Sequence, residues 1–241
     1  TYDKVYVNQE SSNAQDWGIV CAHTMRDFAS WNHVCVAVDT TDGTAANRVK
    51  IYINSVLQTV FASASYPGQN DNIKLNNAKQ RIGASDGSGS AYNHFDGLMA
   101  HFHVLDGVVA DPTSFTEINK GILVPINTDG LTYGTNGYRL EFKQVGVGTA
   151  GTSTIGADTS GEANHFTSSG FVASDCALPD CPENSFCVLA GSQARGDGNI
   201  TMNNGGLSFV KSGSNFSNML CTHALFSGKY YFEMRGGGNL T

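Results

Sequence analysis

Apolar and polar residues alternate with a period of two in several short stretches of the chain. In residues 48–56, RVKIYINSV, the side chains of Val49, Ile51 and Ile53 point one way and those between them point the other. Residues 33–39, HVCVAVD, are nearly all β-branched or small, which is typical of a strand covered on both faces. An Asp-Gly turn signal lies between the two stretches, so they predict an antiparallel hairpin.

Four other stretches have strand-like patterns: 97–107 (GLMAHFHVLDG), 136–144 (NGYRLEFKQ), 205–213 (GGLSFVKSG) and 228–236 (GKYYFEMRG). The best helical candidate is a short turn in 111–121, DPTSFTEINKG, which starts at Asp-Pro and is closed by Gly121. The sequence therefore predicts an all-β fold, an antiparallel sandwich or jelly roll. The expected core residues are Trp31, Val34, Val36, Ile51, Ile53, Phe102 and Leu140.

Charge and composition narrow the choice of partners. Only 15% of the residues are charged, the net charge is −7, and Lys and Arg form no cluster, so we expect no nucleic-acid partner. No apolar run is long enough to span a bilayer, so we expect no membrane insertion. The chain opens on a strand-like segment without an initiator Met. We therefore expect it to be an excerpt or processed product, with neighbouring strands supplied from beyond its ends.

The stretch 144–185 is small, polar and linker-like, which predicts a module boundary near residue 175. The expected domains are a sandwich at 1–172, followed by a linker and the first strands of a second β module at 173–241. Cys35 is expected to be a small buried apolar residue. The cysteine spacing does not match a zinc knuckle, and a bridge between Cys176 and Cys181 stays open.

Three histidines, His94, His101 and His103, lie close together in the chain. They could be metal ligands, with His33 and Asp106 contributing only if the fold brings them near. The alternative is an ordinary strand on which His101 and His103 share a solvent-facing or interface-facing side. We favour the strand, because a zinc site needs three or four ligands.

The segment 156–166, GADTSGEANHF, offers alternating oxygens from Asp158, Ser160, Glu162 and Asn164. Calcium is one interpretation, because it takes six to eight oxygen ligands from such loops. The other is an Asx-type turn in which Asp158 and Ser160 cap their own backbone. The turn is favoured, because the segment lacks a bidentate acidic end.

Ordered motifs resemble a known family. Residues 31–58, WNHVCVAVDTTDGTAANRVKIYINSVLQ, and 81–107, RIGASDGSGSAYNHFDGLMAHFHVLDG, resemble the laminin G-like, concanavalin A-like jelly roll. The version here is most similar to proteins of bacteriophages, especially phages of marine bacteria. Residues 185–241 resemble the opening of a SPRY-type sandwich. Ser55 departs from the family pattern, which usually has Gly at that turn.

The resemblance implies a virion structural and adhesion protein: a tail-fibre, tail-tip or capsid-fibre component at the virion surface. Its expected partners are other virion proteins, further copies of itself as a homo-oligomer, and a host surface glycan. The alternative is a secreted laminin G-type recognition domain that depends on calcium and carries N-glycans at Asn199, Asn215 and Asn239.

A glycan hydrolase is the third hypothesis. It would need two carboxylates flanking the scissile bond, whereas Glu141 and Glu233 are isolated in their strands. No nucleophile elbow or phosphate loop is present in the sequence. The expectation is therefore no enzyme activity, no catalytic residues and no cofactor, with calcium as the one alternative.

Ligand binding is expected in the loops 66–79 and 85–95, which are rich in Asn, Asp, Ser and Tyr. Their donors and acceptors suit sugar hydroxyls, and a tyrosine ring can stack on a pyranose face. The alternative is that these loops only solvate the sandwich or contact neighbouring subunits. The candidate ligand-binding residues are Tyr66, Asn70, Asp86, Tyr92 and Asn93.

Overall fold

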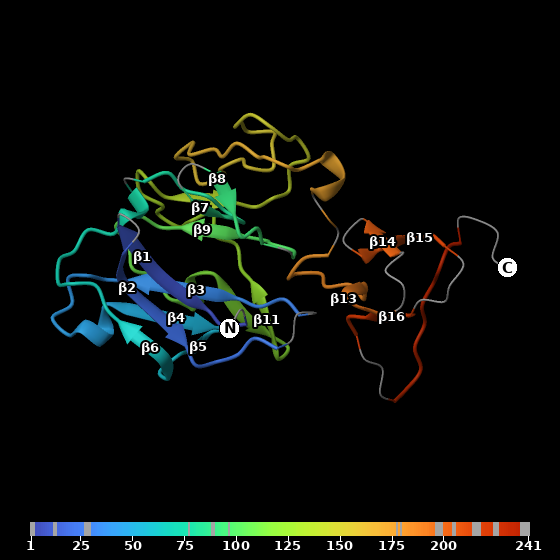
Figure 1. Ribbon diagram of the computed structural model, residues 1–241, viewed down its shortest axis with the longest axis horizontal. Helices are drawn as coiled ribbons and strands as arrows, with labels where there is room; N and C mark the ends of the chain where they lie inside the picture. The colour runs from blue at the N-terminus through green and yellow to red at the C-terminus, as the bar shows by residue number, and fades with distance from the viewer. Residues whose placement is uncertain are drawn as a thin grey trace. The chain divides into compact units, whose positions relative to one another are not determined.

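The computed structural model of the 241-residue chain separates into two compact units, residues 1–186 and 187–241 (Figure 1). Its regular elements are short strands in antiparallel pairs and single turns of 3-10 helix, which confirms the all-β prediction. In the part of the chain described, no helix is long and apolar enough to cross a membrane. The described residues are 3–11, 14–26, 30–76, 78–87, 90–95, 97–176, 178, 180–195, 200–203, 206–213, 218–223 and 227–236.

The described residues of unit 1 form two three-stranded sheets and three strand pairs. The first sheet has the order β1-β2-β6, with bounds Tyr6–Ser11, Ala14–Cys21 and Phe61–Ser65. The second has the order β3-β4-β5, with bounds Val34–Val38, Val49–Ile53 and Val56–Leu57. The pairs are β7 with β8 (Ser85–Gly87, Ser90–Tyr92), β9 with β12 (Phe102–Val104, Tyr138–Leu140) and β10 with β11 (Thr116–Asn119, Ile122–Pro125). Single 3-10 turns are η1 (Ala45–Asn47), η2 (Lys74–Asn76), η3 (Pro112–Ser114) and η4 (Ala173–Asp175).

The main core joins the two three-stranded sheets. Trp17, Ile19 and Cys21 of β2 are buried against Val49 and Ile51 of β4. The alternation of side chains along each strand explains this contact, because every second residue of β2 and β4 faces the same way. Two sheets thus pack face to face through their central strands.

The predicted β3–β4 hairpin is confirmed, with a register that runs from Val34 opposite Ile53 to Val38 opposite Val49. Its loop is held by the buried side chain of Arg48. The guanidinium donates hydrogen bonds to the backbone oxygens of Asp42, Gly43 and Pro67 at 2.8, 3.2 and 2.8 Å. Three carbonyls with no strand partner are thereby satisfied.

The core prediction is confirmed for Ile51, Ile53 and Leu140, which are all buried. It is wrong for Val34 and Val36, which are 42% and 39% exposed. Both valines lie opposite core isoleucines of β4, so their side chains are on the same face of the sheet as the core. They are nevertheless exposed, because β3 is at the edge of its sheet and β2 covers β4 rather than β3.

Two other predicted core residues, Trp31 and Phe102, are only half-buried. The prediction for Cys35 is confirmed, since its side chain is buried. Burial, together with the nearby charge of Asp111, raises the pKa of the Cys35 thiol to about 11. This thiol therefore stays protonated at neutral pH.

The strand expected at 48–56 is interrupted by a tight turn. Asn54 and Ser55 both have positive φ, 49° and 65°, and connect β4 to the short strand β5. Two successive residues with positive φ are typical of a type I′ hairpin turn, for which Asn-Gly is the preferred sequence. Ser55 thus occupies the position at which Gly carries no steric cost.

The helical candidate 111–121 is confirmed only at its start. Asp111 caps η3 by accepting a hydrogen bond from the backbone N–H of Thr113, and Pro112 follows at the first helical position. The rest forms the β10–β11 hairpin, with Lys120 and Gly121 in its turn at positive φ. Gly121 therefore makes a hairpin turn and does not end a helix.

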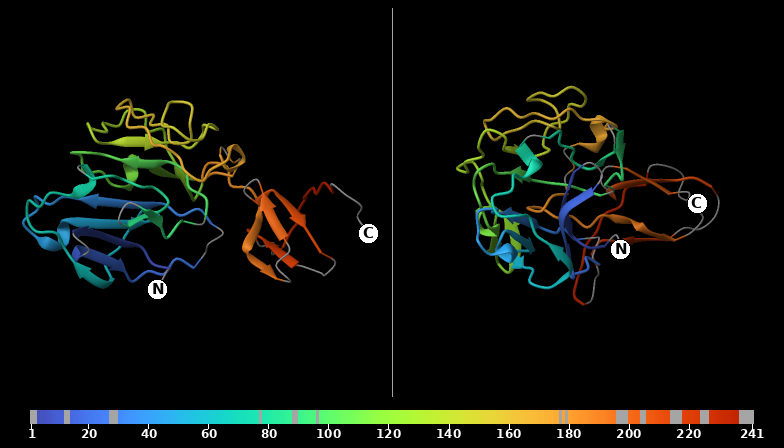
Figure 2. Two further views of the ribbon diagram at one scale, coloured as in Figure 1. Left: turned by 45° about the horizontal axis from the view of Figure 1, so that its top comes forward. Right: turned by 60° about the vertical axis from the view of Figure 1, so that its left-hand side comes forward.

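The first part of the stretch expected to be a linker is packed within unit 1. Ile155 and Ala157 are buried there, and a backbone bridge joins Gly146 to Thr154. Figures 1 and 2 show this yellow segment wound over the side of the unit that carries β7, β8 and β9. The linker prediction is wrong for this part. The small residues that suggested a linker instead allow backbone segments to pack closely against each other.

Where unit 2 is described, its strands form two antiparallel pairs: β13 (Leu189–Arg195) with β16 (Asn218–Cys221), and β14 (Ile200–Asn203) with β15 (Ser208–Lys211). The strand expected at 205–213 is confirmed by β15. The strand expected at 228–236 is wrong, because this segment has no regular structure. Its residues find no ladder partner in the described part of the chain, and Tyr231, Phe232 and Met234 are largely exposed.

Candidate functional site: an uncharged pocket beside β12

The pairing of β9 with β12 positions the site. Tyr138 and Leu140 of β12 are buried, and Arg139 between them points to the opposite face, as the period of two predicts. The ladder places Tyr138 opposite Val104 and Arg139 opposite His103. The two faces of β12 therefore carry different chemistry: one lines a pocket and the other carries a charged network.

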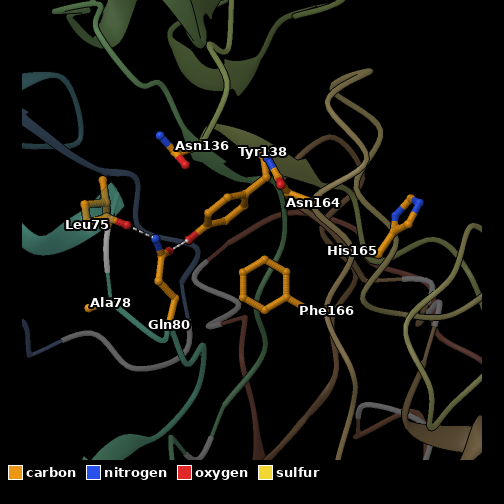
Figure 3. A pocket seen from close by; sticks show the side chains of 8 residues that line it. All are labelled: Leu75, Ala78, Gln80, Asn136, Tyr138, Asn164, His165 and Phe166. Atoms are coloured by element: carbon orange, nitrogen blue, oxygen red, sulfur yellow. Dashed lines mark hydrogen bonds between the residues drawn. The ribbon is translucent and has the colours of Figure 1, made fainter.

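A pocket of about 450 Å³ lies on the Tyr138 side of β12, a size typical of small-ligand sites (Figure 3). Segments far apart in the sequence meet there: the end of the 66–79 loop, β12 with the residues before it, and the loop that precedes Phe166. None of the lining residues is Asp, Glu, Lys or Arg. They are Leu75, Ala78, Gln80, Asn136, Tyr138, Asn164, His165 and Phe166.

Tyr138 is the best-fixed side chain of the pocket. Its hydroxyl donates a hydrogen bond of 2.6 Å to Oε1 of Gln80. The ring packs edge-on against Phe166, with centroids 4.8 Å apart, and is stacked with Phe102 at 6.1 Å. Burial raises the pKa of Tyr138 to about 12, so the hydroxyl remains a neutral donor at physiological pH.

The two asparagines are oriented by their own amide groups. Nδ2 of Asn164 donates to the backbone oxygens of Thr135 and Gly137, both at 2.9 Å. Nδ2 of Asn136 donates to Oδ2 of Asp106 at 2.8 Å. Within the described residues, neither side-chain oxygen accepts a hydrogen bond, so both carbonyls can accept one from a ligand.

His165 completes the lining on the side away from Leu75 and Gln80 (Figure 3). Its Nδ1 accepts a 2.9 Å hydrogen bond from the backbone N–H of Asp158, so the imidazole proton lies on Nε2. The pocket thus combines fixed amide acceptors, an imidazole donor and aromatic rings without formal charge. This set suits a neutral ligand with both hydroxyl groups and apolar faces.

Asp158 organises the loop beside the pocket. Its buried carboxylate accepts three backbone hydrogen bonds, from the N–H groups of Arg139, Ser160 and Asn164 at 2.9, 2.8 and 2.8 Å. Burial would raise its pKa, but these hydrogen bonds outweigh burial and lower it. The Ser160 hydroxyl in turn accepts from the N–H of Glu162, so the predicted Asx-type turn is confirmed.

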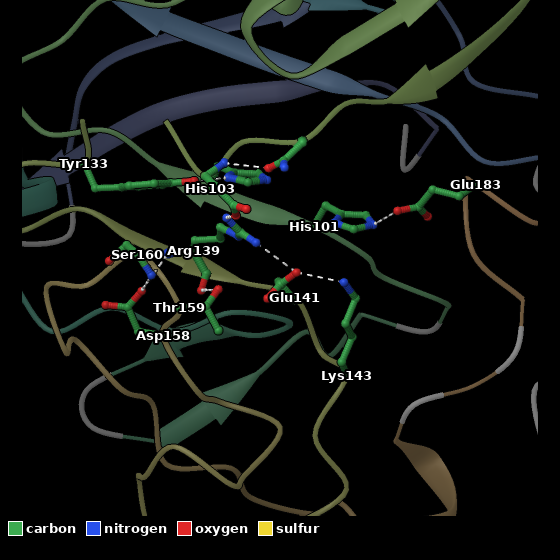
Figure 4. A network of polar contacts seen from close by, with 12 residues as sticks. His101, His103, Tyr133, Arg139, Glu141, Lys143, Asp158, Thr159, Ser160 and Glu183 are labelled. Atoms are coloured by element: carbon green, nitrogen blue, oxygen red, sulfur yellow. Dashed lines mark hydrogen bonds and ion pairs between the residues drawn. The ribbon is translucent and has the colours of Figure 1, made fainter. Parts of the chain in front are cut away.

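The opposite face of β12 carries the charged network drawn in Figure 4. Arg139 forms ion pairs with Asp129 at 2.6 Å and Glu141 at 3.0 Å, and Lys143 reaches Glu141 at 2.8 Å. Burial alone would raise the pKa of Glu141, but hydrogen bonds from Lys143 and Arg139 and their charges lower it to about 2. Glu141 is therefore ionised at neutral pH and engaged in a structural ion pair.

The strand predicted for both His101 and His103 is confirmed for His103 and wrong for His101. His101 has a φ of 51° and precedes β9, and its Nε2 lies 2.6 Å from Oε1 of Glu183. His103 is inside β9, where Nδ1 lies 2.9 Å from the Tyr133 hydroxyl and the ring packs 5.3 Å from Phe115. The positive φ at His101 breaks the alternation on which the prediction depended.

His103 is partly buried rather than solvent-facing. Burial, with smaller contributions from the charges of His101 and Arg139, lowers its pKa to about 4. His94 is exposed and lies in the loop before β9. Among the described residues, no group of three or more His, Cys, Asp or Glu side chains has the arrangement of a metal site.

The five residues predicted to bind a ligand do not line this pocket. Tyr66 packs against the main core, and Asn70 is exposed with a φ of 61°. Asp86 lies in β7 opposite Ala91, while Tyr92 ends β8 and is exposed, followed by the exposed Asn93. Their role in binding stays a prediction. No local pattern in the sequence indicated the pocket, because its residues meet only through the tertiary fold.

Two other expectations concern modification. Cys176 and Cys181 are both free, so the bridge between them is not formed. The candidate glycosylation sites Asn199, Asn215 and Asn239 lie outside the described residues.

No family model matches the chain, and neither the curated proteins nor the solved structures contain a match.

Proposed function

We propose that the chain is a structural and adhesion component of a virion surface, and that its pocket beside β12 binds a neutral sugar of the host surface. One observation carries the binding proposal: the pocket is lined by amide, imidazole, aromatic and aliphatic side chains, with no Asp, Glu, Lys or Arg among them. Nucleic acids and acidic ligands are poor candidates for such a lining, since they call for cations.

A pyranose ring presents hydroxyl groups at its edge and C–H groups on its faces. The side-chain oxygens of Asn136 and Asn164 supply acceptors for hydroxyl protons, and Phe166 supplies an apolar ring at the same pocket. Because both amides are already held by hydrogen bonds, little rotamer entropy is lost when the ligand binds. The contacts match what a neutral sugar requires.

The virion setting is supported by the ordered motifs of the sequence, which resemble the laminin G-like jelly roll of phage proteins, and it accords with an antiparallel all-β chain. A shallow pocket on one module binds weakly, but display in a homo-oligomeric fibre multiplies the contacts. Under this proposal the partners are other virion proteins and further copies of the chain.

A glycan array tests the proposal. The full chain, presented as a multivalent probe, should bind neutral glycans, and Phe166→Ala should lose that signal. Phe171→Ala is the matched control, because Phe171 is 48% exposed and does not line the pocket. A wild-type probe that binds no glycan, or that releases sugar from one, would contradict the proposal.

A further inference from the structure

Unit 2 holds two cysteines at the same end of one strand pair. In the β13–β16 ladder, Leu189 lies opposite Cys221. The pairing continues past the strand end, since the N–H of Thr222 donates to the oxygen of Val188 at 2.9 Å, and the N–H of Val188 donates to the Thr222 hydroxyl at 3.1 Å. These hydrogen bonds of Val188 therefore hold the adjacent Cys187 beside β16.

The register places the two thiols on one face. Side chains alternate along an extended segment, so Cys187 points the same way as Leu189, two residues later. Leu189 and Cys221 are directly opposite and share a face, which makes Cys187 and Cys221 diagonal neighbours across the ladder. The Cys187 side chain is near enough to Cys221 to contribute to the raised pKa of the Cys221 thiol.

All six cysteines are among the described residues, and all are free thiols in this structure. Cys21, Cys35 and Cys176 are buried, and Cys181 is half-buried. Cys187 and Cys221 alone are exposed to solvent, so these two combine mutual contact with access to an oxidant. No other cysteine of the chain meets both conditions.

We infer that Cys187 and Cys221 form a disulfide when the chain meets an oxidising environment, closing residues 188–220 into a covalent loop. A disulfide needs the Cα atoms of the two residues within about 7 Å of each other. Diagonal neighbours across a ladder are about 7 to 8 Å apart, so the ends of the two segments must move slightly closer as the bond forms. The bond would stabilise unit 2 chiefly by restricting its unfolded chain. This inference is independent of the proposed sugar binding.

The reaction balances with oxidised glutathione as the oxidant. The thiolate of one cysteine attacks a glutathione sulfur, which forms a mixed disulfide and releases one glutathione thiolate. The second cysteine's thiolate then attacks the protein sulfur of that mixed disulfide and releases the second glutathione. The two protons lost by the cysteines end on the two glutathione thiols, so the protein becomes lighter by two hydrogen atoms.

The rate of closure should increase with pH. Burial, followed by the charge and hydrogen bond of the Cys187 thiol, raises the pKa of Cys221. Only the thiolate is nucleophilic, so a raised pKa leaves less of it at neutral pH. Once closed, the bond should persist in air and open in excess dithiothreitol.

The test uses the full chain, reduced and then incubated with oxidised glutathione. Peptide mapping without reduction should find one cross-linked pair, Cys187 with Cys221, and a thiol titration of the native protein should show two fewer reactive groups. Cys187→Ser and Cys221→Ser should each instead retain a bound glutathione on the remaining cysteine. Cys181→Ser is the control and should form the same cross-link as the wild type.

Thermal unfolding gives a second readout. The oxidised wild type and the oxidised Cys181→Ser variant should melt at a higher temperature for unit 2 than their reduced forms, whereas Cys187→Ser should show no such shift. The inference is overturned if the wild type keeps separate glutathione adducts on both cysteines. It is also overturned if mapping joins either cysteine to a different one.

Discussion

The hydroxyl of Tyr138 donates a 2.6 Å hydrogen bond to Oε1 of Gln80, a residue 58 positions earlier in the chain. The Gln80 side-chain nitrogen in turn donates to the backbone oxygen of Leu75. One glutamine therefore connects β12 to the loop on the other side of the pocket. Because the tyrosine is buried, this bond is shielded from competing water.

Tyr138→Phe removes the donor and leaves the ring in place. We expect the free energy of unfolding of unit 1 to fall by about 1 kcal/mol, the usual net contribution of one hydrogen bond. Urea unfolding followed by tryptophan fluorescence measures it, because both tryptophans, Trp17 and Trp31, belong to unit 1. In a double-mutant cycle with Gln80→Ala, additive effects would show that the two residues are not coupled.

Asp158 is predicted to be structural rather than a calcium ligand. Asp158→Ala would leave three backbone N–H groups without their acceptor, so we expect a loss of roughly 3 kcal/mol or more in the free energy of unfolding. Asp158→Asn keeps one acceptor oxygen and should lose less. Millimolar calcium should leave the melting temperature of the wild type unchanged, and a calcium-dependent rise would contradict this role.

The partly buried His103 should make unit 1 less stable in mild acid. Its pKa in the folded protein, about 4, is below the unfolded value of 6.5, so the unfolded chain takes up a proton that the folded chain does not. Above pH 6.5 the histidine has no effect. As the pH falls from 6.5 to 4, the free energy of unfolding should decrease by up to about 3 kcal/mol.

His103→Gln isolates this contribution, because glutamine keeps a polar partner for Tyr133 without a titrating group. Urea unfolding should show a shallower loss of stability between pH 6.5 and 4 in this variant than in the wild type. Carboxylates that titrate in the same range are common to both proteins and cancel in the comparison. His94→Gln, at an exposed position, should keep the wild-type slope. Equal slopes for His103→Gln and the wild type would refute the assignment.

The hairpin turn between β4 and β5 should be improved by glycine. Ser55 has a φ of 65°, which costs a residue with a Cβ about 1 kcal/mol. Its hydroxyl lies 3.2 Å from that of Thr116, a contact whose loss offsets part of the gain. We expect Ser55→Gly to raise the melting temperature of unit 1.

The matched control is Ser63→Gly. Ser63 is an exposed residue of β6, where glycine adds flexibility to the unfolded chain and relieves no strain. This variant should melt below the wild type. A Ser55→Gly protein that also melts lower would show that the Thr116 contact outweighs the backbone strain.

Local signals in the sequence were sufficient for part of the fold. The alternation around Ile51 and the Asp-Gly turn predicted the β3–β4 hairpin, and the acid-to-serine spacing predicted the turn at Asp158, because these features form between residues close in the chain. The exposure of Val36 was not predictable in this way. It depends on which neighbouring strand covers β3, and alternation identifies a face but not what packs on it.

The pocket could not be predicted from local sequence patterns either, because it also depends on which segments pack together. Gln80, Tyr138 and Phe166 come from three separate segments, and none belongs to a motif whose spacing suggests a site. The single residue His101 shows how a small backbone change defeats a pattern. Its positive φ rotates the chain just before β9, so two histidines at strand spacing end in different surroundings.

Titration calorimetry with the neutral glycan that gives the strongest array signal decides whether the pocket beside β12 binds a sugar. We expect Phe166→Ala to weaken binding about tenfold, which corresponds to about 1.4 kcal/mol. Phe171→Ala and Tyr92→Ala should bind as the wild type does. Equal affinity of Phe166→Ala and the wild type would refute sugar binding at this pocket, and binding lost only in Tyr92→Ala would place the site at the β7–β8 hairpin instead.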